Sequence, residues 1–183
     1  MSEQQMKRHT MIAWMEDKPG VLNRVASLFR RRNFNIESLA VGHSETSGIS
    51  RMTFVARGNN RELRQVQTQL DKLINVVDIQ DVTHEPVVMR ELAMIKVKAT
   101  NGSRAQVMQL VDIYRASVID VGMESLIVQI VGAEERVESF IKLLDNFGIE
   151  EMTRTGRIAM VRGPKSEKQI EVEAAVFGSN GQK

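Results

Sequence analysis

The stretch MEDKPGVLNRVASLF, residues 15–29, marks the point where the sequence changes from the period of a strand to the period of a helix. The run HTMIAWME, residues 9–16, is short and apolar, which predicts a strand. From Val21 onward the apolar residues recur on one face of a helix. The Asp-Lys-Pro-Gly turn therefore joins a strand to a helix N-terminus. Pro19 preorganises the first helical turn, and Gly20 allows a ligand to approach the backbone closely.

The residues after this junction predict one α/β module. SETSG, residues 44–48, has the composition of a hairpin loop, and Asn59 and Asn60 can cap a second helix. The element order is β-α-β-β-α-β, which is the ferredoxin-like arrangement. Its expected strands cover residues 9–16, 34–44, 49–58 and 76–84, with helices after Gly20 and Asn59.

The second half of the chain repeats this order of elements without obvious residue identity. Its expected strands cover residues 92–99, 117–123, 125–132 and 149–162, with helices after Ser103 and before Asn146. We therefore expect an α+β protein of two tandem ferredoxin-like βαββαβ modules. Pro86 interrupts the strand pattern between them. The expected domains are residues 8–84 and 92–163, with a linker at 85–91 and a mobile tail at 164–183.

The composition is that of an ordinary globular protein. Of 183 residues, 42% are apolar and 26% charged, and the net charge is only +2, which argues against nucleic acid or a membrane as the partner. No apolar run approaches the ~20 residues of a membrane span. Residues 1–8 are too polar for a signal peptide. Since cysteine is also absent, we expect a soluble cytoplasmic protein.

The sequence offers weak support for catalysis. His9, His43 and His84 are too far apart for a metal-ligand motif, and each is expected on the surface or at a strand end. RNA-recognition modules share the βαββαβ order but need stacked aromatic residues on the central strands. The matching strand here has Phe54 alone, and Trp14 fits a core or interface position better. The arginines at 30–32 fit a solvated helix end.

The junction itself suggests a ligand. A helix N-terminus attracts a carboxylate through its unpaired N–H groups and the helix dipole. Asp17 offers an anion for an ammonium group. Both poles of a zwitterionic amino acid could thus be met in this loop. The alternative, which spacing alone favours, is that Asp-Lys-Pro-Gly is only a good turn for starting a helix.

Longer motifs resemble one known family. Pro-Gly-Val-Leu-Asn-Arg-Val (19–25), Phe-Asn-Ile-Glu-Ser-Leu (34–39) and Ser-Arg-Met-Thr (50–53) resemble the ACT domain of the regulatory, or small, subunit of acetohydroxyacid (acetolactate) synthase. The second half is similar to the same family at residues 90–97 and in the Arg-Thr-Gly motif that begins at Arg154. The resemblance covers about residues 7–163.

The resemblance implies a regulatory subunit without a catalytic site, with no nucleic acid or membrane as partner. Its catalytic partner would use thiamine diphosphate, Mg²⁺ and FAD in branched-chain amino-acid biosynthesis. The chain would activate that partner and confer feedback inhibition by valine, leucine or isoleucine at the interface of an ACT homodimer. The alternative is a stand-alone amino-acid-sensing ACT protein with another target. Carried over from the family, the effector-binding residues are Asp17, Gly20, Val21, Leu22, Asn35 and Ile36.

Two positions depart from the family pattern. Many relatives have Asn where this chain has Asp17. A carboxylate suits the ammonium group of an amino acid but repels a nearby carboxylate, so Asp17 bears on affinity and on the choice of effector. Asn33 replaces a frequent Gly and tolerates the same backbone conformation.

Overall fold

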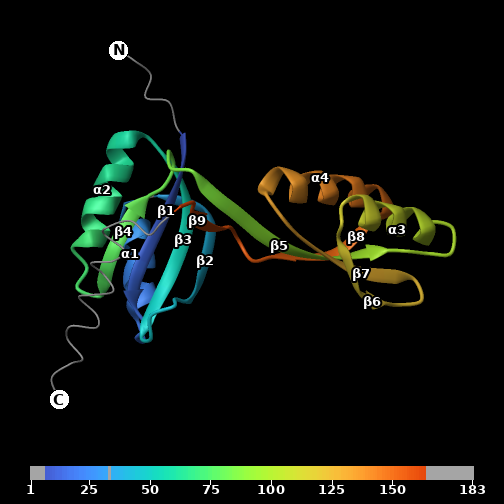
Figure 1. The fold of residues 1–183 in the computed structure, drawn as a ribbon, viewed down its shortest axis with the longest axis horizontal. Coiled ribbons are helices and arrows are strands. Elements are labelled where there is room, and N and C mark those ends of the chain that lie inside the picture. Colours follow the sequence, from blue (N-terminus) through green and yellow to red (C-terminus); the bar gives the residue numbers. More distant parts are fainter. Residues whose placement is uncertain (1–6, 33, 164–183) are drawn as a thin grey trace, which may run out of the picture. The chain divides into compact units, whose positions relative to one another are not determined.

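The computed structural model describes residues 7–32 and 34–163, which form two compact units (Figure 1). The first unit contains the described residues up to Val88 together with those from Ala159 onward, and the second contains Met89–Ile158. The predicted tail at 164–183 and the predicted helix-end role of Asn33 lie outside the described residues.

The first unit is a four-stranded antiparallel sheet in the order β2-β3-β1-β4. β1 and β3 are central, and β2 and β4 are the edges. Its elements are β1 (Lys7–Glu16), α1 (Val21–Arg31), β2 (Asn35–His43), β3 (Ile49–Gly58), α2 (Asn60–Asp71) and β4 (Val76–Asp81).

The core of this unit lies between the sheet and its two helices. Apolar residues of α1 and α2 share one face of each helix, so burial of that face fixes both helices against the sheet. Phe29 of α1 meets Phe54 of β3 edge to face, with ring centroids 5.0 Å apart. The buried core residues are Met11, Ala13, Met15, Val21, Val25, Leu28, Phe29, Met52, Phe54, Ala56, Leu63, Val66, Leu70 and Ile79.

The second unit repeats the topology, with its sheet in the order β6-β7-β5-β8. Figure 1 shows α3 and α4 on one side of this sheet. The prediction of an α+β fold with two βαββαβ arrangements is therefore confirmed. The elements are β5 (Val87–Lys98), α3 (Arg104–Ile113), β6 (Ser117–Val121), β7 (Ser125–Gly132), α4 (Glu134–Leu144), a 3-10 turn (Asp145–Phe147), β8 (Ile149–Arg154) and β9 (Ile158–Val161).

The boundary between the units differs from the expected one. The expected linker at 85–91 is largely the beginning of β5, because the alternating pattern of that strand starts at Val87, directly after Pro86. The chain enters the second unit after Val88 and leaves it after Ile158. The second unit is thus an insertion within the first.

The expected strand at 149–162 is two strands, β8 and β9, and β9 pairs with β5. Within the first unit, Arg162 N–H donates to the carbonyl of Pro86 at 2.7 Å. Ala159 is buried, and its carbonyl accepts a hydrogen bond of 2.5 Å from Nη2 of Arg51. Burial lowers the pKa of Arg51.

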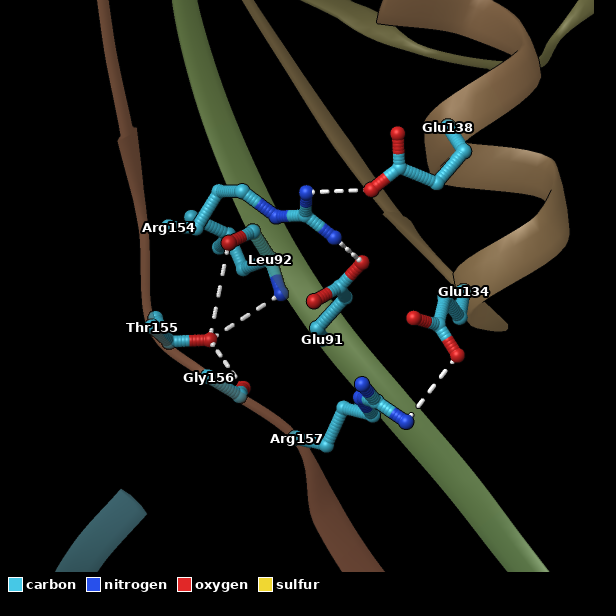
Figure 2. Close-up of polar contacts among 8 residues, drawn as sticks. All are labelled: Glu91, Leu92, Glu134, Glu138, Arg154, Thr155, Gly156 and Arg157. Atoms are coloured by element: carbon cyan, nitrogen blue, oxygen red, sulfur yellow. Dashed lines mark hydrogen bonds and ion pairs between the residues drawn. The ribbon is translucent and has the colours of Figure 1, made fainter. Parts of the chain in front are cut away.

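A polar network explains why the last strand breaks after Arg154 (Figure 2). The Arg154 guanidinium pairs with the buried Glu91 carboxylate and also reaches Glu138 at 2.5 Å. Burial alone would lower the pKa of Arg154, but these two carboxylates raise it. Thr155 and Leu92 exchange two hydrogen bonds of 3.1 Å, one through the threonine hydroxyl.

The next two residues complete the break. Gly156 has φ +78°, a left-handed conformation that favours glycine. Arg157 pairs with Glu134 at the start of α4, at 2.9 Å. The chain therefore leaves β8 through a segment held by side chains on β5 and α4.

His9 is buried, so the expectation of a surface or strand-end histidine is wrong at this position. Its Nδ1 lies 3.2 Å from Oδ2 of Asp81, across the β1–β4 pair. Thr83 donates to the other oxygen of Asp81 through both its backbone N–H and its hydroxyl. Burial would raise the pKa of Asp81, but together these hydrogen bonds lower it.

This lowered pKa predicts that Asp81 contributes to stability in a pH-dependent way. The folded state favours the carboxylate, so its contribution is present above about pH 4, the ordinary value, and is lost as pH falls through the lower folded-state pKa. Urea unfolding of the native chain and of Asp81→Asn should therefore differ most at neutral pH, and the difference should shrink below about pH 4. A difference that stays constant over this range would contradict the assignment.

Candidate functional site

The N-terminus of α1 is open to an anion. Its N-cap is Gly20, with φ +84°, and no side chain caps the helix. No acidic residue lies in the first turn. The helix α2 differs, because Asn59 and Glu62 form a complete capping box there, as the sequence predicted for Asn59. Because α1 has no such cap, its first-turn backbone amides have no side-chain acceptor.

Asp17 is fixed by the hairpin between β2 and β3. Its backbone N–H donates to the carbonyl of Gly48 at 2.8 Å. Its Oδ2 lies 3.1 Å from Nδ1 of His43, the last residue of β2. Both side chains are accessible, with exposed fractions of 45% for Asp17 and 86% for His43. A carboxylate is thus presented at the turn that leads into α1.

Asn75 holds the other side of the same turn. Its carbonyl accepts from the Glu16 N–H at 2.9 Å, and its side-chain amide donates to the Glu16 carboxylate at 2.5 Å. This hydrogen bond, followed by one from Lys18, lowers the pKa of Glu16. Arg24 of α1 donates to the Asn75 side chain at 2.8 Å. The turn is therefore hydrogen-bonded to two loops: the β2–β3 loop, through Gly48, and the loop before β4, through Asn75.

Of the remaining predicted residues at this turn, Gly20 and Leu22 are exposed and Val21 is buried. A Cβ atom on Gly20 would meet no protein atom within 4 Å, so the space in front of it is open. Leu22 is exposed beside it, whereas the Val21 side chain is buried in the core. Only the backbone of Val21 could therefore serve a ligand, and its N–H already makes a 3.3 Å bond to the carbonyl of Lys18.

Asn35 and Ile36 lie at the opposite end of the same sheet. Asn35 pairs with Arg57, whereas His43, beside Asp17, pairs with Ser50. β1 spans 10 residues between these ends, a distance of about 30 Å. Asn35 is exposed, and Ile36 packs against the core. Within one chain, the structure does not bring these two residues to the Asp17 turn.

His43, Gly48 and Asn75 were not predicted as members of this region. Each is brought to the turn by strand pairing over more than 25 residues of sequence, and no local pattern marks such a contact. Gly48, at φ +76°, carried a weak signal as a turn glycine. His43 carried none beyond its place at a strand end.

The residues considered for RNA binding are placed elsewhere. Phe54 is fully buried in the core and cannot stack on a base. Trp14 is also buried, as expected, and the Arg51 guanidinium lies 5.5 Å from its ring centre. The arginines at 30–32 are exposed at the end of α1, as predicted.

The described part of the chain brings no group of three His, Cys, Asp or Glu side chains into a position to hold a metal ion. Among residues 7–32 and 34–163, every helix is too short or too polar to span a bilayer.

Two family models match the chain. An acetohydroxyacid synthase small subunit-like ACT domain matches residues 12–78, and the small subunit of acetolactate synthase matches residues 90–163. The first match covers the sheet and helices around the Asp17 turn. The fold and this turn thus define a regulatory ACT-domain protein.

Individual relatives agree over nearly the whole chain. The acetolactate synthase small subunit of Mycobacterium bovis is 50% identical, covering 87% of this chain and 95% of that protein. The probable acetolactate synthase small subunit of Methanothermobacter thermautotrophicus is 47% identical, covering 91% of this chain and 99% of that protein. The crystal structure of the small subunit from Thermotoga maritima aligns with a TM-score of 0.81 at 40% identity, covering 87% and 99%. The chain belongs to the acetolactate synthase small subunit family.

Proposed function

We propose that this regulatory subunit binds valine, leucine or isoleucine at the Asp17 turn and passes feedback inhibition to a catalytic large subunit. The observation that carries the proposal is the uncapped N-terminus of α1 beside a fixed carboxylate. The first-turn amides would hold the carboxylate of the amino acid, and Asp17 would face its ammonium group. In this proposal the large subunit carries thiamine diphosphate, Mg²⁺ and FAD, and the complex of the two subunits acts in branched-chain amino-acid biosynthesis.

The distance between Asn35 and Asp17 supports a homodimer that completes this site. β2 is an edge strand, and Leu39 at its middle is exposed by 40%. Edge strands offer unpaired backbone groups to a second chain. A two-fold axis through Leu39 would pair two β2 strands antiparallel and set Asn35 opposite the partner's His43. Since His43 contacts Asp17, Asn35 from one subunit would then approach the turn of the other.

This arrangement predicts that Leu39→Lys converts the dimer to a monomer. A lysine at the centre of an edge strand disfavours pairing with a second edge, because two like charges would meet at the axis. Sedimentation equilibrium of the full chain should show the change, and stabilisation by valine should fall with it. Ile74→Lys, at a side chain exposed by 89% outside the strands, is the matched control and should leave the dimer intact. A dimeric Leu39→Lys variant would contradict the proposed interface.

The function as a whole is tested by reconstitution. The chain should co-purify with the acetolactate synthase large subunit of the same organism and raise its rate of acetolactate formation. Valine, leucine or isoleucine should inhibit the complex but not the large subunit alone. A chain that binds these amino acids without associating with the large subunit would instead be a stand-alone sensor with another target.

A further inference from the structure

The sheet of the first unit has a second buried face, on the side away from its two helices. Successive residues of a strand point to opposite faces of a sheet, and Ile12 and Trp14 alternate with core residues of β1. Thr53 and Val55 alternate in the same way with core residues of β3. None of these four side chains is more than 5% exposed. We call the surface that they form the outer face.

The strand β9 covers a part of the outer face. Among the described residues of the first unit, Ala159 reaches this face, because it is buried and its carbonyl accepts from Arg51. The next residue of β9, Met160, is 67% exposed and so points away from the sheet. One alanine side chain is too small to exclude water from all four residues of the outer face. A further segment is needed to bury them.

A buried carboxylate borders the outer face. Asp78 of β4 pairs directly with Trp14, so the two side chains lie on the same side of the sheet. Asp78 is only 7% exposed, and its Oδ2 atom is buried without a hydrogen-bond partner in the described part of the chain. A carboxylate removed from water is costly unless a cation or a donor meets it. The segment that covers the outer face should therefore bring a positive group to Asp78.

We propose that the C-terminal segment at residues 168–176 covers the outer face and that Lys168 pairs with Asp78. The described chain ends within the first unit, where the Arg162 N–H donates to the carbonyl of Pro86. Six residues lead from Arg162 to Lys168, and an extended chain of this length spans about 20 Å. A four-stranded sheet is about 15 Å wide. Lys168 is thus within reach of Asp78.

The sequence of this segment matches the outer face in charge and in pattern. Lys168 supplies the positive group. Apolar residues then recur at alternate positions, at Ile170, Val172, Ala174 and Val176. On an extended chain these residues would share one side with the lysine, and the two glutamates between them would face water. Neither family model extends beyond residue 163, so the segment lies outside the family match.

The experiment uses Trp14, the single tryptophan of the chain, as a probe of the cover. In the full chain its emission should lie at short wavelength and resist quenching by acrylamide. Val172→Glu should shift the emission to longer wavelength and increase the quenching, because a charged side chain would not pack against the outer face. Ala175→Glu adds the same charge at the alternate set of positions and is the matched control. It should leave both signals unchanged.

A chain stopped after Gly163 should show at least the effect of Val172→Glu, with circular dichroism to verify that it folds. The ion pair is tested by urea unfolding of the full chain, followed by the same fluorescence. Lys168→Gln should lower the midpoint of unfolding, and Lys168→Arg should keep it. In an Asp78→Asn background, Lys168→Gln should have no further effect, because the carboxylate that it pairs with is absent.

The inference is overturned if Trp14 stays as protected in Val172→Glu, or in the stopped chain, as it is in the native chain. Equal effects of Lys168→Gln with and without Asp78→Asn would overturn the proposed ion pair. Protection that survives Val172→Glu but disappears when the protein is diluted would assign the cover to a second copy of the chain. Valine binding is measured separately, so each of these failures would leave the proposed effector function standing.

Discussion

Gly20→Asp should abolish the thermal stabilisation of the chain by valine. The Cβ of residue 20 would point into open space at the N-terminus of α1, where the carboxylate of the ligand is proposed to lie. An aspartate there would occupy the space and place a negative charge beside the same amides. At one hundred times its dissociation constant, a ligand adds about 2.7 kcal/mol to the stability of the native chain, and this gain should disappear.

Gly20→Ala is the matched control for this variant. Both substitutions place a side chain on a residue with φ +84°, which costs about 1–2 kcal/mol, but only aspartate adds a charge. The alanine variant should therefore start from a similarly lowered melting temperature and keep part of the response to valine. A Gly20→Asp chain that valine stabilises as strongly as the native chain would show that the site lies elsewhere.

Arg154→Ala should lower the free energy of unfolding of the second unit by about 3–5 kcal/mol. Glu91 is only 4% exposed, and Arg154 is the cation that pairs with its carboxylate (Figure 2). Removing the arginine would leave a buried charge without a partner, which costs more than the pair itself contributes. Urea unfolding followed by circular dichroism measures the change.

Glu138→Gln tests the same network from its exposed side. Glu138 also pairs with Arg154, but its side chain is 54% exposed. Its loss should therefore cost less than about 1 kcal/mol. The double variant Glu91→Gln, Arg154→Ala should recover part of the stability lost in Arg154→Ala, because no unpaired charge remains. Equal costs for Arg154→Ala and Glu138→Gln would show that the burial of Glu91 is unimportant.

The sequence predicted the local elements well, because their signals lie within a few residues of one another. The alternation across residues 49–58 corresponds to β3, and Asn59 caps α2 as its position before an amphipathic run suggested. These features depend on the period of side chains and on capping, which are local properties.

The features that the sequence did not predict depend on contacts between distant residues. The buried position of His9 depends on Asp81, on a strand that lies 72 residues further along the chain. The break between β8 and β9 depends on Glu91 and on side chains of α4. The Asp17–His43 contact likewise requires the hairpin to close first. Strand periodicity carries no information about such partners.

The insertion of the second unit between Val88 and Ala159 has a consequence for genetics. A stop codon after Val88 would remove β9, and with it the carbonyl that accepts from the half-buried Arg51. An internal deletion of residues 89–158, closed by a short glycine-rich bridge, would keep Ala159 together with the hydrogen bond from the Arg162 N–H to the carbonyl of Pro86, which holds this segment within the first unit. A nonsense mutation directly after Val88 should thus be more harmful to the first unit than the in-frame deletion of residues 89–158, although both remove the second unit.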